Sequence, residues 1–140
     1  MAESQKILPH TADIKIQLTA DTLSGLFHVG LNSLNQLLLA DPDYPKDQEP
    51  TVVEHLDLKS VDATSLLIDF LSEVLTLSQI HKVVFFDFQA EKLTENRLQA
   101  TIRGTPVASF NEDIKAVTYH EAEIRLNSRN EWETNIVFDI

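Results

Sequence analysis

The sequence has 140 residues, no cysteine and only three glycines. The absence of cysteine excludes disulfides, thiolate metal sites, iron–sulfur clusters and cysteine nucleophiles. So few glycines, and no motif of the right spacing, exclude the glycine-rich loops that hold nucleotide phosphates. There are 22 acidic residues against 11 Lys and Arg, for a formal net charge of −11, and no basic run. A nucleic-acid-binding protein normally presents a basic surface, so we expect no tight, direct nucleic-acid binding. From the chain length we expect a single domain spanning residues 1–140.

Targeting signals are also missing from the pattern. No stretch reaches the roughly 20 apolar residues of a membrane span. The first ten residues, MAESQKILPH, lack the basic region and apolar run of a secretory signal. We expect a cytoplasmic protein with no membrane association, and the sequence leaves its oligomeric state open.

The first part of the chain predicts a strand followed by a helix. Apolar and polar residues alternate over 13–19 (DIKIQLT), which is typical of a half-buried strand. Asp21 and Thr22 can then cap a helix that runs to about Leu39, because its leucines keep the three-four spacing of one helical face. Residues 40–50 hold three of the five prolines and predict a surface loop.

A second unit repeats this plan. Residues 52–58 predict a strand, and Asp62 can cap a helix over 63–79 with an apolar stripe. Residues 82–88 (KVVFFDF) are rich in β-branched and aromatic types and predict a well-buried strand.

The last third predicts strands alone. Leu98, Ala100 and Ile102 alternate with polar residues, and further strands are expected over 116–126 and 132–140, joined by an Asn-Ser-Arg-Asn turn. The expected class is therefore α+β. Two helices would pack on mixed or antiparallel sheets, as two β-α-β-like units followed by C-terminal antiparallel strands.

Three polar segments interrupt these patterns: 10–13 (HTAD), 115–120 (KAVTYH, within the expected strand 116–126) and 138–140 (FDI). Taken alone, each has an ordinary structural interpretation, as a turn, a half-exposed strand and a solvated chain end. The evidence for catalysis is weak, because no Ser lies in a glycine-flanked nucleophile elbow. His55 and His81 also lack partners at metal-ligand spacing.

Together the segments are more informative. HTAD, LLIDFLSEVL at 66–75, KAVTYH and a terminal VFDI at 137–140 occur in that order, and the chain resembles the archease family over nearly its whole length. The resemblance implies a non-catalytic accessory protein. It would activate the RNA ligase of tRNA splicing, which joins 3′-phosphate or 2′,3′-cyclic-phosphate ends to 5′-hydroxyl ends. It would do so by promoting the ligase's guanylylation and multiple turnover.

The resemblance also implies the site. A divalent metal ion would be bound by Asp13, Asp139 and the main-chain end at Ile140. Lys115, with His10 and His120, would serve the partner and its activation. If the first and last strands are neighbours, carboxylates about 4 Å apart repel by roughly 1 to 4 kcal/mol, and a divalent cation converts that repulsion into coordination. Oxygen ligands favour hard ions; calcium is expected, with magnesium or manganese as alternatives.

The chain departs from the family pattern at two places. Pro9 stands where the family usually has an acid, and residues 107–113 (VASFNED) replace a loop that often carries His and Gly. Two other functions remain open. In a metal-dependent hydrolase of a small phosphorylated substrate, Asp13 and Asp139 would hold a metal that activates water. A general chaperone for nucleic-acid-modifying proteins would need an exposed apolar patch.

Overall fold

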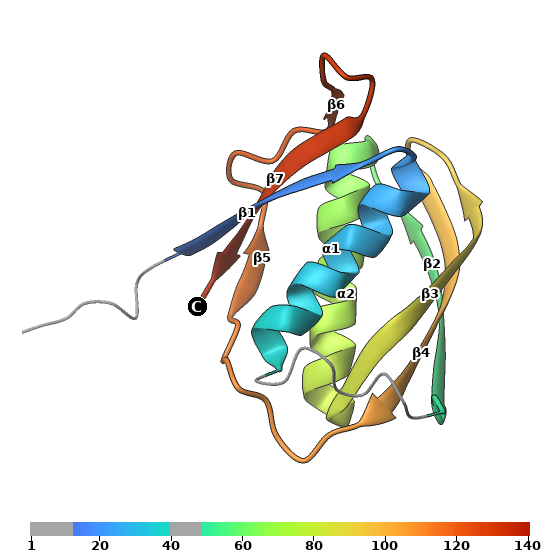
Figure 1. Cartoon of the computed structure of the whole chain (residues 1–140). Helices are drawn as coiled ribbons and strands as arrows, with labels where there is room; N and C mark the ends of the chain where they lie inside the picture. Colours follow the sequence, from blue (N-terminus) through green and yellow to red (C-terminus); the bar gives the residue numbers. More distant parts are fainter. Residues whose placement is uncertain (1–12, 40–48) are drawn as a thin grey trace, which may run out of the picture.

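Two α-helices lie between two antiparallel sheets in the computed structural model, which describes residues 13–39 and 49–140 (Figure 1). The elements in chain order are β1 (Asp13–Ala20), α1 (Leu23–Leu38), β2 (Val52–Lys59), α2 (Ala63–His81), β3 (Val83–Leu93), β4 (Arg97–Pro106), β5 (Ala116–Thr118), β6 (Arg125–Leu126) and β7 (Trp132–Asp139). Sheet A has the order β1-β7-β5, with β6 also paired to β7, and sheet B has the order β2-β4-β3. The predicted α+β class is confirmed.

Both predicted helix caps are confirmed. The Thr22 side chain accepts a hydrogen bond from the Gly25 N–H at 2.9 Å, and Asp62 accepts one from the Ser65 N–H at 2.8 Å. The end of α2 differs from the prediction, because the helix continues two residues past Gln79. Lys82 then adopts a left-handed conformation (φ 54°) and its N–H bonds the Ser78 carbonyl. It closes α2 and leaves Val83 to begin β3.

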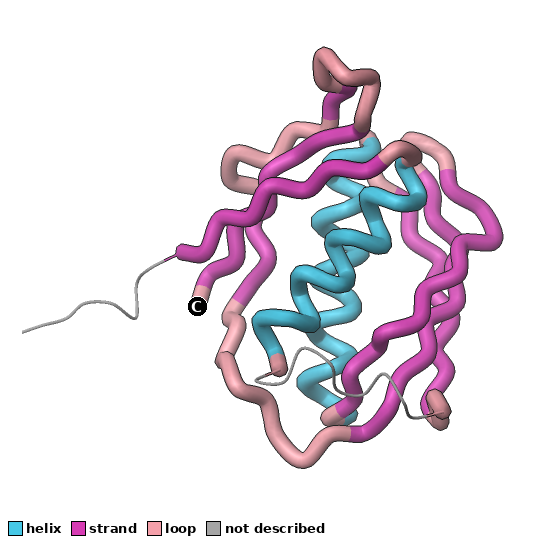
Figure 2. The backbone as a smooth tube through the Cα atoms, in the orientation of Figure 1, coloured by secondary structure: helices cyan, strands magenta, loops and turns pink. Residues whose placement is uncertain are grey.

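The core fills the space between the sheets. Helix α1 packs on β1 and β3, and α2 packs on β5 and β3, so each helix contacts both sheets (Figure 2). Helix α2, with 19 residues, is long and apolar enough, by length and composition alone, to cross a membrane. Eight of them are buried in the folded chain, which is the environment of a core helix.

Sheet B is regular except for two bulges in β3, one of which falls between Phe85 and Asp87. Next to it Gly104 of β4 lies so close to β3 that a Cβ atom there would come 2.2 Å from the Val84 carbonyl oxygen. This close approach requires glycine. Strands β2 and β3 flank β4 in this sheet, whereas β1, before α1, belongs to sheet A.

The expected strand over 116–126 is wrong in its middle. The chain forms β5, a loop over residues 119–124, and then the two-residue strand β6. Glu121 in this loop has a left-handed backbone (φ 59°), which a continuous strand cannot accommodate. The other predicted strands are confirmed. Of the predicted loop at 40–50, residues 40–48 lie outside the described residues.

Candidate functional site

One row of residues runs across the end of sheet A. Strands β1 and β7 pair antiparallel with Asp13 directly opposite Asp139, and on the other side of β7 Ala116 is also opposite Asp139. The prediction that the first and last strands are neighbours is confirmed. Directly opposite residues have Cβ atoms about 5 Å apart on the same face. That face is the solvent face at Asp13, because the next residue, Ile14, packs on the core.

Lys115 joins this row through its backbone. Its N–H donates to the Asp139 carbonyl at 2.7 Å, and its side chain is exposed. Asp13 is exposed and Asp139 is half-buried. Within residues 13–39 and 49–140, none of these three side chains has a hydrogen-bond or ion-pair partner. The end of sheet A thus holds two opposed carboxylates and a nearby free cation.

A second row lies one pleat repeat away on the same face. Lys15 and Thr118 each pair with Val137, about 7 Å along the strands from the Asp13–Asp139 row. The Lys15 ammonium binds the Glu121 carboxylate at 3.0 Å, and the other oxygen of Glu121 lies 3.3 Å from the His120 Nε2. Lys15 lowers the pKa of Glu121, first through this hydrogen bond and then through its charge. His120 is therefore near the site, but in the loop rather than in the predicted strand.

The remaining predicted residues are placed as follows. His10 lies outside the described residues, and Ile140 follows β7 and is half-buried. No group of three or more His, Cys, Asp or Glu side chains in the described part of the chain is arranged to hold a metal. The candidate donors at the end of sheet A are therefore two side-chain carboxylates and the main-chain end.

Sequence reasoning missed a second feature of the loop. The Tyr119 hydroxyl donates a hydrogen bond to the Asp69 Oδ1 of α2, and Ser60 Oγ donates to Asp69 Oδ2 at 2.5 Å. The bond to Asp69 raises the pKa of Tyr119, because it stabilises the protonated phenol. Periodicity could not reveal this pair, because the two residues lie in different elements, and Asp69 reads as a polar position of a helix.

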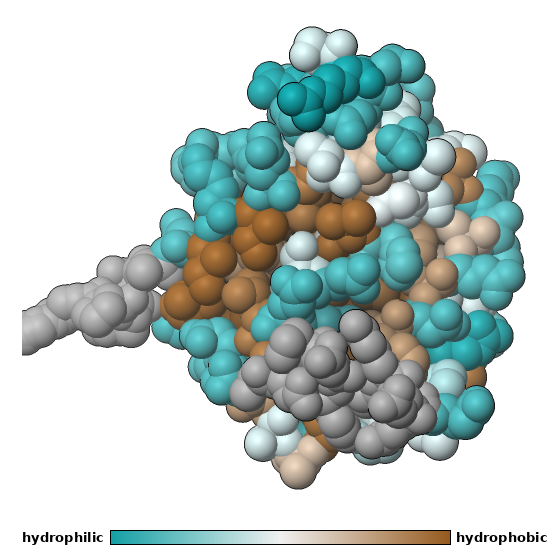
Figure 3. Space-filling model, viewed as in Figure 1, coloured by the Kyte–Doolittle hydropathy of each residue, from teal (hydrophilic) through white to brown (hydrophobic). Residues whose placement is uncertain are grey.

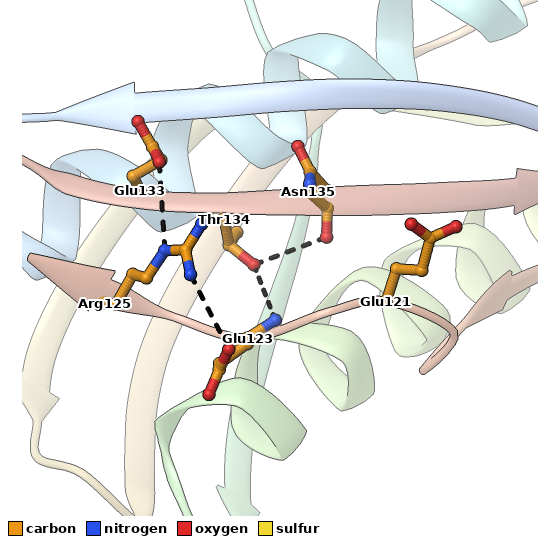
Figure 4. Close-up of a pocket in the computed structure, with 6 residues that line it drawn as sticks. All are labelled: Glu121, Glu123, Arg125, Glu133, Thr134 and Asn135. Atoms are coloured by element: carbon orange, nitrogen blue, oxygen red, sulfur yellow. Dashed lines mark hydrogen bonds and ion pairs between the residues drawn. The ribbon is translucent and has the colours of Figure 1, made fainter. Parts of the chain in front are cut away.

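Further along the loop lies an acidic pocket lined by Glu121, Glu123, Arg125, Glu133, Thr134 and Asn135 (Figure 4). Arg125 lies between two of the carboxylates, 3.9 Å from Glu123 and 4.0 Å from Glu133. The Thr134 hydroxyl accepts from the Glu123 N–H at 3.1 Å and donates to the Asn135 carbonyl. The lining residues thus form hydrogen bonds and ion pairs with one another, and the main effect of the pocket is to add negative charge to this side of the molecule.

The surface beside the site is apolar. On the face in Figure 3 hydrophobic side chains gather over β1 and the neighbouring part of sheet A. Ile14 and Ile16 of β1 are half-buried and alternate with the exposed Asp13 and Lys15. The charged side chains of this edge strand thus face solvent, and its half-buried apolar side chains face the core.

Comparison with known proteins fits this arrangement. The model of the archease protein family (MTH1598/TM1083) matches residues 6–140, a range that includes β1, β5 and β7. The chain belongs to the archease family. Protein archease of Methanosarcina barkeri is 32% identical over 95% of this chain and 93% of the relative. Protein archease of Pyrococcus furiosus is 30% identical over 94% of each.

Solved archease structures support the same fold. The crystal structure of a Thermotoga maritima archease, described as a possible chaperone, superposes with a TM-score of 0.65 at 20% identity and covers all of both chains. The solution structure of Methanobacterium thermoautotrophicum protein 1598 gives a TM-score of 0.72 at 20% identity, covering 93% of this chain and 94% of that one. As an archease, the chain is an accessory protein rather than an enzyme.

Proposed function

We propose that this archease activates the RNA ligase of tRNA splicing, promoting transfer of GMP to the ligase and allowing multiple turnover. The observation that carries the proposal is the convergence of three distant segments at one end of sheet A. Asp13 opposes Asp139, and Lys115 is hydrogen-bonded to Asp139 through the backbone. These are the residues that the archease resemblance marks as functional.

The site fits a divalent cation by its donor chemistry. Like charges directly opposite each other destabilise a strand pair, and no cationic side chain in the described residues neutralises Asp13 or Asp139. Asp13, Asp139 and the main-chain end at Ile140 would hold the ion. Their oxygens suit calcium first, with magnesium and manganese as alternatives. The bound ion would supply positive charge where the two strands otherwise repel.

The residues around the ion suit a role in protein contact. Lys115 presents a mobile, compact cation beside the acidic row, and a cation can stabilise the phosphate charge of a nucleotide. Lys15, Glu121 and His120 add exposed charged and polar groups beside this row, as in the polar rim of a protein interface. With a net charge of −11, the partner is expected to be a protein rather than bare RNA.

The direct test measures incorporation of radiolabelled GMP into the cognate ligase, with this protein added in sub-stoichiometric amounts. We expect the rate of GMP transfer to rise and the ligase to turn over repeatedly. The protein alone should neither ligate RNA nor hydrolyse phosphoesters. A ligase rate that does not change on addition of the folded protein would contradict the proposal, and phosphoester turnover by the protein alone would favour a hydrolase.

A further inference from the structure

The loop 119–124 is held to α2 at both of its ends. At the start Tyr119 donates its hydroxyl hydrogen to Asp69, and at the end the Ile124 N–H donates to the Thr64 hydroxyl at 2.9 Å. Thr64 and Asp69 are more than one turn apart on the same helix. Both ends of the loop are therefore fixed relative to one rigid element.

Burial alone does not hold Tyr119 in place. The residue is 57% exposed, so packing contributes less to its position than it does for a core aromatic. The hydrogen bond to Asp69 supplies the constraint. Asp69 is itself held from the opposite side by Ser60, which lies in the connection between β2 and α2. The carboxylate is thus fixed between two hydroxyl groups and offers a defined acceptor for the phenol.

Between its two ends the loop presents His120 and Glu121 to solvent. Glu121 has a left-handed backbone (φ 59°), which is unfavourable for a residue with a side chain. This conformation places its carboxylate on Lys15 and beside the His120 ring. The turn is closed by a bond from the Ala122 N–H to the Tyr119 carbonyl at 3.1 Å. A backbone of this kind persists only where neighbouring contacts determine it.

We infer that Asp69 is a positioning residue that acts through Tyr119 to hold loop 119–124. Held in this way, His120 and Glu121 form a second contact for the protein partner, beside the Asp13–Asp139 row. The inference rests on the proposed function for the partner, and on the two loop attachments for the geometry. Asp69 itself is half-buried on α2 and acts at a distance through the phenol. Its effect on the partner should therefore disappear once Tyr119 has lost its hydroxyl.

A double-mutant cycle tests this dependence. Asp69→Ala, Tyr119→Phe and the double variant are compared for the concentration that gives half-maximal GMP transfer to the ligase. We expect each single variant to raise this concentration about tenfold, the size expected for loss of one hydrogen bond to a charged acceptor. The double variant should lose no more than either single variant. Multiplicative losses, or single variants equal to wild type, would overturn the inference.

One control separates positioning from general damage. Asp57→Ala removes an exposed carboxylate from sheet B, which carries neither of the loop attachments, and should stimulate as wild type does. Tyr119→Phe deletes only one oxygen from a largely exposed residue and should fold. If Asp69→Ala fails to fold, Tyr119→Phe alone tests the role of the hydrogen bond.

Spectroscopy tests the geometry without the ligase. The chain has two tyrosines, and subtraction of the Tyr119→Phe spectrum isolates the phenolate absorbance of Tyr119. Asp69→Ala should lower the pKa of Tyr119 and shift the NMR resonances of the His120 ring. Unchanged His120 resonances would overturn the positioning role. If wild-type protein fails to stimulate the ligase while both spectroscopic changes occur, the proposed function is wrong. The dependence of the loop's position on Asp69 is then still supported.

Discussion

The opposed carboxylates at the end of sheet A contrast with the ion pairs of sheet B, where Lys59 also faces Arg97 but Arg97 is bound by Asp57. On sheet B opposite charges stand across neighbouring strands: Arg97 binds both oxygens of Asp57 at 3.2 and 3.1 Å, and Arg103 pairs with Asp87 at 3.2 Å. At the end of sheet A two like charges, Asp13 and Asp139, face each other across β1 and β7. Charge pairs across strands stabilise a sheet when opposite in sign and destabilise it when alike.

On the proposed function, this difference separates structural charges from functional ones. The pairs on sheet B support strand pairing locally and need no ligand. The opposed carboxylates on sheet A work against strand pairing, so their presence is best explained by something that binds them. Positions that break a local stability rule are where function is expected.

The largest expected effect is structural and belongs to sheet B. Gly104→Ala should destabilise the protein by about 3 kcal/mol, because its Cβ would stand 2.2 Å from the Val84 carbonyl oxygen. Gly30→Ala in α1 is the matched control. There the nearest atom is a flexible leucine methyl at 3.3 Å, and alanine favours helix by about 1 kcal/mol over glycine. Urea denaturation should rank the two variants clearly, and equal costs would contradict the close approach in sheet B.

Metal binding should stabilise the folded protein through the carboxylates of sheet A and not through those of sheet B. An ion that binds only the folded state adds about 2.7 kcal/mol at one hundred times its dissociation constant. We expect calcium to raise the melting temperature of wild-type protein and of Asp57→Asn, but not of Asp139→Asn. Without metal, Asp139→Asn should melt slightly higher than wild type, because one of two like charges is gone. Equal changes in the melting temperatures of wild type and Asp139→Asn with calcium, magnesium and manganese would contradict the proposed metal site.

The smallest effect concerns acid and the sheet B ion pair. The hydrogen bond from Arg97 is the main cause that holds the pKa of Asp57 below its ordinary value of 3.8. Because the folded pKa is the lower one, this pair stabilises the fold above pH 3.8. The contribution is lost as the pH falls through the lowered value. In a carboxyl NMR titration Arg97→Ala should raise the pKa of Asp57, and an unchanged titration would show that the pair is not formed.

Local patterns predicted the elements whose signals are local. Alternation located β1 and β4, and Thr22 and Asp62 located both helix starts, because a cap bonds a backbone N–H three residues further along the chain. The pairing of Asp13 with Asp139 was also expected, since the archease resemblance brought the two chain ends together. Residues such as His10 remain predictions, because they lie outside the described residues.

The errors come from contacts between distant segments. The sequence from 116 to 126 contains no glycine or proline, so nothing local predicted the loop at 119–124. Its shape depends on Asp69 and Thr64 of α2, and on the left-handed Glu121. Lys82 is a similar case, because a lysine gives no local sign that it will end a helix in the left-handed conformation. Tertiary contacts overrode propensity at both places.

The most direct measurement compares the two sheets in one assay of GMP transfer to the ligase. Asp13→Ala and Lys115→Ala alter the end of sheet A, and Asp57→Ala and Lys59→Ala make the same changes on sheet B. All four positions are exposed, so each variant should fold with stability within about 0.5 kcal/mol of wild type. We predict that the sheet A pair fails to stimulate GMP transfer while the sheet B pair matches wild type. Full stimulation by Asp13→Ala and Lys115→Ala, or equal loss in all four variants, would contradict the assignment of function to sheet A.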